Sequence, residues 1–546
     1  MGFGVLAATA LRVAIWTKCC QRELNIRMTY RNEKTMIVHI PNEPALRNQR
    51  RTTTHRRALA STLLAMGLAL TLIAAGTTEA RSGPPPIAEP ASTSIPDTPA
   101  GHQLRWFLEA TRSLPIPVPA IEEHLSAALL AQAPPDQLNL FLDQSGYSTL
   151  VFLRVVSATE MSIDAAVDPG TGGPPVVFSL AVDADGRIAG IGTKFVPLSP
   201  RAERGLAPVS LPSPTGRFAV GTETFVVTDA ARDGRRIPVQ LWYPADRRSA
   251  RKSSPAQYAL PATSATIAEQ LAVPVEDVAA IRTNAFAGPD LARTRRRLPV
   301  VLFSPGFEVS RFFYSGLAAD LASHGYVVAV LEHPGEYQPV EFPDGSIVAP
   351  GPVDSEEAEA ALLPVRIADI RAAQGLLARL DAKPGARMHN ALDLGKVALA
   401  GHSFGGAVAA EAMRLNQGVS AGINLDGTMH GRVVDTGLDR PFLLLGSDGH
   451  EEQDPTWTSF RTRSPQTTTL EIAGTAHMNF TDLPALFAFR SPDEPREFLQ
   501  IGAIDPRRST KIQTAYVRAF LDHHLRNKPT PLLDGPSRRY PEVRFS

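Results

Sequence analysis

The sequence contains almost no cysteine and carries no net charge, and each of these absences excludes a kind of partner or chemistry. Its 546 residues include two cysteines, Cys19 and Cys20, which both precede an apolar run at 58–75. The 55 basic and 55 acidic side chains balance, so the chain lacks the basic excess that nucleic-acid binding usually requires. We therefore expect no nucleic-acid partner and, once the leader is removed, no disulfide or thiol nucleophile.

Metal-binding and phosphate-binding motifs are missing as well. The sequence has no His-Glu-x-x-His string, no cysteine pattern of the metal-binding kind and no glycine-rich phosphate loop. It therefore predicts neither a metal site nor a cofactor.

An export signal is predicted within a leader at residues 1–80. Four arginines between residues 50 and 57 precede the apolar run at 58–75, and Thr78–Ala80 resembles a cleavage site. We expect an exported protein, periplasmic or secreted, that is cleaved near Ala80. A membrane anchor formed by 58–75 is the alternative, because the run is close to the length that spans a bilayer.

Changes in composition divide the rest of the chain. Proline-rich segments at 81–101 and 201–216 predict linkers. Between them, residues 102–200 show helical periodicity and then alternating β-type runs, which predicts a small α+β domain that resembles the NTF2-like accessory domains found ahead of some serine hydrolases. Residues 217–546 alternate apolar strands with helices, so we expect a doubly wound, mostly parallel α/β sheet.

The stretch Lys396–Ala410 carries the sharpest local signal. An apolar strand leads into Gly401-His402-Ser403-Phe404-Gly405, and an alanine-rich helix follows. A serine on a tight turn between strand and helix needs small neighbours, which Gly401 and Gly405 supply. This pattern is typical of the nucleophile elbow of an α/β-hydrolase, and it makes Ser403 the candidate nucleophile.

The nucleophile needs a base and the base needs an orienting acid, and in this fold both follow the serine along the chain. Asp426 ends an apolar strand at 422–425, and His477 lies in the loop after a strand at 470–472. Asp448 ends the strand between them and is the alternative acid. We expect supporting or loop positions for the other nearby histidines, His402, His430 and His450.

Several strings, in one order along the chain, resemble the plasma-type platelet-activating factor acetylhydrolases. They are Leu302–Phe307, Leu317–His333, Gly401–Gly406, Leu425–Gly427 and His477–Phe480, within a similarity that covers about residues 215–527. The resemblance implies a metal-independent serine esterase that releases short or oxidised acyl chains from phospholipids.

The same resemblance implies a role for each site residue. It makes Ser403 the nucleophile, Asp426 the orienting acid and His477 the general base and then general acid. The backbone N–H groups of Phe307 and Phe404 would form the oxyanion hole. This chain has Pro305 where the family usually has histidine; the proline leaves the Phe307 N–H in place but leaves the substrate preference open.

We therefore expect a carboxylic ester hydrolase that acts through an acyl-enzyme on a small ester or lipid, with transient contact to a lipid surface. A cutinase-like or polyester-degrading enzyme, or a general lipase-esterase, is the alternative within this chemistry. The alternative from another class is a non-catalytic protein in which the accessory domain and the cleft of the hydrolase domain bind an apolar ligand without turnover. The sequence predicts no oligomeric state.

Overall fold

The structure is a computed structural model whose described residues fall into two compact units, divided in the chain after Val196. The described residues are 27–30, 36–39, 94–144, 147–168, 175–195, 198–336, 338–351, 356–490 and 499–546. The predicted apolar run at 58–75 and cleavage site near Ala80 lie outside them. None of the helices among the described residues is long and apolar enough to cross a membrane.

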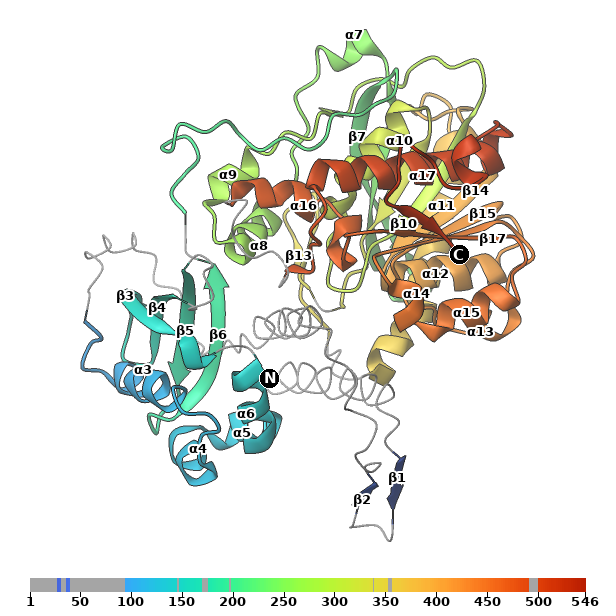
Figure 1. Cartoon of the computed structure of the whole chain (residues 1–546). Coiled ribbons are helices and arrows are strands. Elements are labelled where there is room, and N and C mark those ends of the chain that lie inside the picture. The colour runs from blue at the N-terminus through green and yellow to red at the C-terminus, as the bar shows by residue number, and fades with distance from the viewer. Residues whose placement is uncertain are drawn as a thin grey trace. The chain divides into compact units, whose positions relative to one another are not determined.

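The N-terminal unit places helices before a sheet, in the order that the periodicity predicted (Figure 1). Its helices are α3 (Pro99–Ala110), α4 (Val118–His124), α5 (Ala127–Gln132) and α6 (Pro135–Gln144). Its four antiparallel strands follow in sequence order: β3 (Val151–Ala158), β4 (Ser162–Asp168), β5 (Val176–Val182) and β6 (Ile188–Phe195). Helix α3 packs on the sheet through Phe107, whose ring stacks on Phe178 at 5.0 Å between centroids. Farther upstream, β1 (Arg27–Tyr30) pairs with β2 (Met36–His39).

The larger unit is built on a ten-stranded sheet in the order β18-β17-β16-β15-β14-β10-β11-β8-β7-β9. Its strands are β7 (Ala219–Asp229), β8 (Arg235–Ala245), β9 (Phe286–Ala287), β10 (Leu298–Ser304), β11 (Val327–Leu331), β14 (Leu392–His402), β15 (Ala421–Leu425), β16 (Phe442–Gly446), β17 (Thr467–Ile472) and β18 (Val543–Phe545). The six strands from β17 to β11 run parallel, while β8 and β18 flank them in antiparallel pairing. This confirms the mostly parallel α/β-hydrolase sheet.

Helices cover both faces of this sheet (Figure 1). Helices α10 (Ser315–Ser323) and α17 (Pro506–Arg526) contact each other on one face, and α11 (Glu356–Ala382) and α12 (Phe404–Leu415) pack on the other. Because both faces are buried, the central strands are continuous apolar runs, and every residue of β10 and β11 is buried. The parallel strands end at one edge, so residues that follow different strands meet there.

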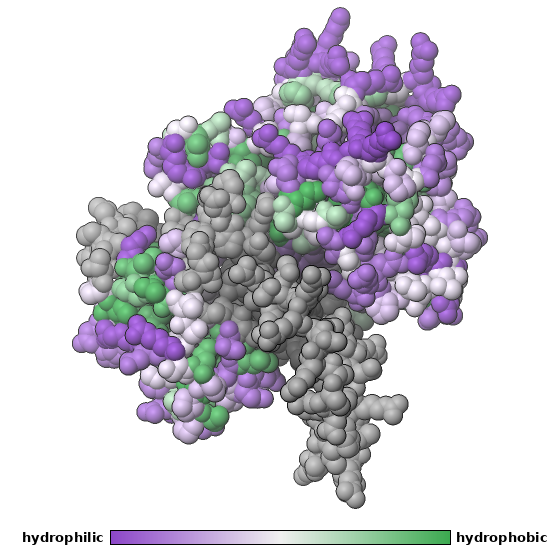
Figure 2. All heavy atoms as spheres, viewed as in Figure 1, coloured by the Kyte–Doolittle hydropathy of each residue, from purple (hydrophilic) through white to green (hydrophobic). Residues whose placement is uncertain are grey.

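Shorter elements connect these helices and strands. They are α7 (Arg247–Ala250), α8 (Pro261–Leu271), α9 (Val275–Ala279), β12 (Val340–Glu341), β13 (Ile347–Val348), α13 (Val433–Thr436), α14 (His450–Gln453), α15 (Pro455–Thr462) and α16 (Leu483–Leu486). Hydrophilic side chains cover much of the face of this unit that Figure 2 shows, with smaller apolar patches between them.

Candidate active site

Ser403 lies at a strained turn between β14 and α12. Its backbone angles are φ 54° and ψ −130°, a region that side-chain-bearing residues rarely adopt and that costs about 1–3 kcal/mol. A Cβ added at Gly401 would lie 2.1 Å from the Gly405 carbonyl, and one added at Gly405 would lie 2.1 Å from the Ser304 carbonyl oxygen. The close backbone approach predicted for the two glycines of the elbow is confirmed.

Asp426 follows β15, and its carboxylate holds the imidazole of His477. Nδ1–H of His477 donates to Oδ2 of Asp426 at 2.7 Å. The N–H of Ser447 donates to the other carboxylate oxygen at 2.6 Å, which fixes the orientation of Asp426. With its proton on Nδ1, His477 carries its lone pair on Nε2. The side chain of Asp426 is 2% exposed and that of His477 is 31% exposed, so the imidazole reaches solvent while the carboxylate does not.

A second histidine contacts the same carboxylate. Nδ1 of His450 lies 3.0 Å from Oδ1 of Asp426, and Nε2 lies 3.4 Å from Oδ2 of Asp454. Burial alone would lower the pKa of His450, but its contacts with the two carboxylates outweigh burial and raise that pKa to about 9. Burial would raise the pKa of Asp426, yet hydrogen bonds from His450 and His477 hold it well below its usual value. Asp426 therefore stays ionised next to an imidazolium.

Asp448, the alternative acid, has different partners. Its carboxylate accepts the N–H of Gly474 at 2.8 Å and forms an ion pair with Arg544. The side chain is 43% exposed, so it lies in a more hydrated environment than Asp426 does. The structure pairs His477 with Asp426 and not with Asp448.

A chain of buried hydrogen bonds joins three loops around Ser403. The N–H of Gly306 donates to the hydroxyl of Tyr314 at 2.9 Å, and that hydroxyl donates to Nδ1 of His402 at 3.0 Å. Nε2–H of His402 donates to the carbonyl of His477 at 3.0 Å. Burial and the nearby His477 lower the pKa of His402 to about 3, so its ring stays neutral. His402 has the supporting position expected of it, whereas no pattern in the sequence pointed to Tyr314.

The two residues expected to form the oxyanion hole lie in segments next to the turn at Ser403. Phe404 follows Ser403 directly and begins α12, where helix N–H groups lack partners within the helix. Phe307 follows Gly306, and a Cβ added at Gly306 would lie 3.3 Å from Cβ of Ser403. The backbone of both segments therefore passes next to the serine.

A second serine–histidine–aspartate arrangement, which the sequence did not predict, is formed by residues at the end of β10, after β11 and in α11. Oγ of Ser304 is 3.0 Å from Nε2 of His333, and Nδ1 of His333 is 2.8 Å from Oδ2 of Asp369. Ser304 and Asp369 are 0% exposed and His333 is 5% exposed. Because no substrate carbonyl reaches a fully buried hydroxyl, we assign these three residues a structural role.

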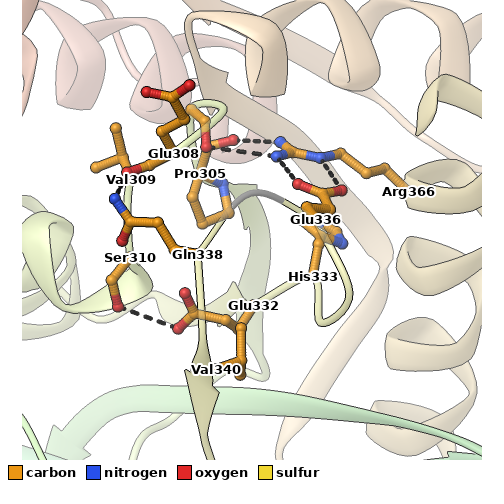
Figure 3. Close-up of a pocket in the computed structure, with 11 residues that line it drawn as sticks. Pro305, Glu308, Val309, Ser310, Glu332, His333, Glu336, Gln338, Val340 and Arg366 are labelled. Atoms are coloured by element: carbon orange, nitrogen blue, oxygen red, sulfur yellow. Dashed lines mark hydrogen bonds and ion pairs between the residues drawn. The ribbon is translucent and has the colours of Figure 1, made fainter. Parts of the chain in front are cut away.

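Among the cavities lined by described residues are two near the sheet, and Ser403 lines neither of these two. The one in Figure 3 measures about 20 Å³ and is lined by residues that include Pro305, Glu336 and Arg366, which leaves room for about one water. The other measures about 220 Å³ and has a mostly apolar lining from β10, β14 and α11. Across the described ranges, no group of three or more His, Cys, Asp or Glu side chains is arranged to hold a metal.

Comparison with known proteins gives matches to both units. Residues 206–337 and 377–530 match the family model described as "Platelet-activating factor acetylhydrolase, isoform II", and residues 95–188 match one described as "ORF 12 gene product N-terminal". A probable 1-alkyl-2-acetylglycerophosphocholine esterase of Arthroderma benhamiae is 29% identical over 61% of this chain and 93% of its own length. The platelet-activating factor acetylhydrolase of Cavia porcellus is 28% identical over 43% of this chain and 59% of its own length.

A solved structure adds a likeness at the level of the fold. A ferulic acid esterase from Streptomyces cinnamoneus superposes with a TM-score of 0.54 and is 34% identical. The match covers 62% of this chain and 99% of the esterase.

Proposed function

Because this chain belongs to the platelet-activating factor acetylhydrolase isoform II family and is a serine esterase, we propose that it cleaves short-chain acyl esters, those of phospholipids included, at Ser403. The observation that carries the proposal is the contact of 2.7 Å between His477 and Asp426 at the same sheet edge as the strained serine. That arrangement fits a nucleophile, a base and an orienting acid.

The reaction proceeds in two steps through an acyl-enzyme. Oγ of Ser403 attacks the ester carbonyl carbon and passes its proton to Nε2 of His477. The carbon–oxygen bond then breaks, and the alcohol leaves with that proton. In the second step water gives a proton to His477 and attacks the acyl group, and the acid is released as Oγ regains its proton.

Two further contributions lower the barrier. The N–H groups of Phe307 and Phe404 stabilise the negative oxygen that forms in both steps, and one such donor is worth about 3 kcal/mol. Asp426 keeps the His477 tautomer fixed and stabilises the imidazolium without taking its proton.

The serine assignment is tested with two matched variants. We expect Ser403→Ala to lose roughly a millionfold in p-nitrophenyl acetate hydrolysis and to lose labelling by a fluorophosphonate probe. Ser304→Ala, which alters the buried arrangement, should still be labelled. Labelling of Ser403→Ala would refute the assignment, and a wild-type protein that is neither labelled nor active would favour the binding protein without turnover.

The ferulic acid esterase likeness supports a second candidate substrate class, esters with a bulkier aromatic acyl group. The two classes are separated by comparing kcat/KM for a 2-acetyl phospholipid with kcat/KM for ethyl ferulate. Tributyrin and a polyester film extend the comparison to the substrates of lipase-like and cutinase-like enzymes. A preference for the acetyl phospholipid supports the first candidate. Higher turnover of the ferulate ester would contradict it.

We also propose that the protein is exported, on the basis of the arginines and the apolar run at 58–75. Mass spectrometry of the protein recovered from the culture medium or periplasm should find a mature N-terminus at or near Arg81. Recovery of the uncut chain in the membrane fraction would favour the membrane anchor instead.

A further inference from the structure

One buried arginine contacts both segments expected to form the oxyanion hole, one through its backbone and the other through the Phe404 ring. Arg366 lies in α11, and its side chain is 2% exposed. Its Nη1–H donates to the carbonyl of Pro305 at 2.6 Å, and its Nη2–H donates to the carbonyl of Gly306 at 3.4 Å. The guanidinium also lies 5.0 Å from the ring centroid of Phe404. Figure 3 shows Arg366 between Pro305 and the carboxylate of Glu336.

These contacts fix the direction of the backbone N–H groups. In a trans peptide the carbonyl and the N–H point in opposite directions. The Pro305–Gly306 peptide is held on both sides, because Arg366 binds its carbonyl and Tyr314 accepts its N–H at 2.9 Å. In the next peptide, Arg366 binds the Gly306 carbonyl, so the N–H of Phe307 points away from the arginine.

The same guanidinium restrains the second donor through its side chain. The Phe404 ring packs against Arg366 as a cation–π partner, and Phe404 supplies the backbone N–H that follows Ser403. A single side chain from α11 therefore sets the position of two segments that are distant in sequence. Small displacements matter at this point, because a misplacement of about 1 Å in an active site lowers rates by about a hundredfold.

Glu336 makes this arrangement possible. Its carboxylate binds Arg366 through two hydrogen bonds, of 2.8 Å from Nε and 2.5 Å from Nη2, and the Glu336 residue is 5% exposed. A buried ion pair is weak evidence for stability, since apolar residues of similar volume often replace such pairs without loss. The ion pair holds Arg366 where it donates hydrogen bonds to two backbone carbonyls. Apolar residues of similar volume would not make these hydrogen bonds.

We propose that Arg366 is a positioning residue for the oxyanion hole, which directs the N–H groups of Phe307 and Phe404 toward the oxygen that becomes negative. This inference rests on the proposed function, because it requires a serine-based acyl transfer at Ser403. Arg366 touches neither the substrate nor the reacting atoms, and its effect passes through the backbone it holds.

The test compares Arg366→Lys with a matched control, Arg414→Lys. Arg414 lies at the far end of α12 and forms a similar arginine–glutamate pair with Glu411, with 3.1 Å between Nε and Oε1. For each variant we measure kcat/KM on p-nitrophenyl acetate, the affinity for a trifluoromethyl ketone and the melting temperature. The carbonyl carbon of the ketone bonds to Oγ of Ser403. The carbonyl oxygen then becomes negatively charged and lies in the oxyanion hole.

We expect Arg366→Lys to lower kcat/KM by between about 10-fold and about 1,000-fold, with a parallel loss of affinity for the ketone. Lysine keeps the charge but cannot bind the Glu336 carboxylate and both carbonyls in one plane. Arg414→Lys should lower the melting temperature and leave kcat/KM and ketone affinity within about twofold of wild type, because it lacks these backbone contacts.

The outcomes separate the inference from the proposed function. A folded Arg366→Lys protein with unchanged kcat/KM or unchanged ketone affinity overturns the positioning role. If Arg366→Lys does not fold, Glu336→Gln replaces it, since loss of the partner's charge loosens the arginine; reduced ketone affinity then supports the inference and unchanged affinity overturns it. A wild-type protein without ester hydrolysis would overturn the proposed function itself.

Discussion

The imidazolium of His450 should make the stability of the larger unit depend on pH between about 6.5 and about 9. Two buried carboxylates, Asp426 and Asp454, raise the pKa of His450 from 6.5 to about 9 against the opposing effect of burial. A group whose pKa is higher in the folded state stabilises the fold fully below its unfolded value. That contribution disappears as the pH rises through the folded value. A rise from 6.5 to about 9 corresponds to about 3 kcal/mol.

The measurement is urea unfolding of wild type and His450→Gln at several pH values from 6 to 10. Trp457 is a suitable fluorescence probe, because its ring lies 4.3 Å from that of His450. We expect wild type to be about 3 kcal/mol more stable than the variant at about pH 6, and this difference to vanish by about pH 10. In an Asp454→Asn background, which removes one carboxylate, the difference at about pH 6 should be smaller and should vanish at a lower pH than in wild type. A difference that stays constant across the whole range would refute the buried imidazolium.

Three further variants test other parts of the site. Asp426→Asn should lower kcat by about 10⁴-fold, because the amide favours the wrong tautomer of His477, whereas Asp448→Asn should leave kcat near wild type; equal losses in a kinetic assay would contradict the choice of acid. Tyr314→Phe removes the hydroxyl that accepts the Gly306 N–H at 2.9 Å and should lower the free energy of unfolding by about 1–3 kcal/mol, and a urea midpoint equal to wild type would show that this hydrogen bond adds no stability.

The parts of the site that sequence could predict are those with a local cause. Gly401 and Gly405 reveal the elbow because the backbone passes within contact distance of itself there, and no larger residue fits. Asp426 and His477 could be placed because each follows an apolar strand, and parallel strands in one sheet end at a common edge. The contact of 2.7 Å between these two side chains fits that reasoning.

The supporting residues could not be predicted, because their partners lie far away in the sequence. Arg366 sits in α11, in a stretch whose periodicity predicts a helix and reveals nothing of the backbone carbonyls at Pro305 and Gly306. Tyr314 belongs to an apolar run that gives no reason to expect a hydroxyl with two partners. The short edge strands β9 and β18 were missed for a different reason, since two or three residues are too few to show a period.

The two serine–histidine–aspartate arrangements show why distances alone do not identify a nucleophile. β10 and β14 are adjacent parallel strands, and Ser304 lies in register with Gly401, so both serines stand near the same sheet edge. Ser304 remains within its strand and is 0% exposed, whereas the turn at φ 54° carries Ser403 out of the strand. Asp369 also differs from Asp426, because its carboxylate pairs with two arginines as well as with His333. Access created by a strained backbone, together with a carboxylate whose side-chain partners are histidines, therefore distinguishes Ser403, the proposed nucleophile, from the buried Ser304.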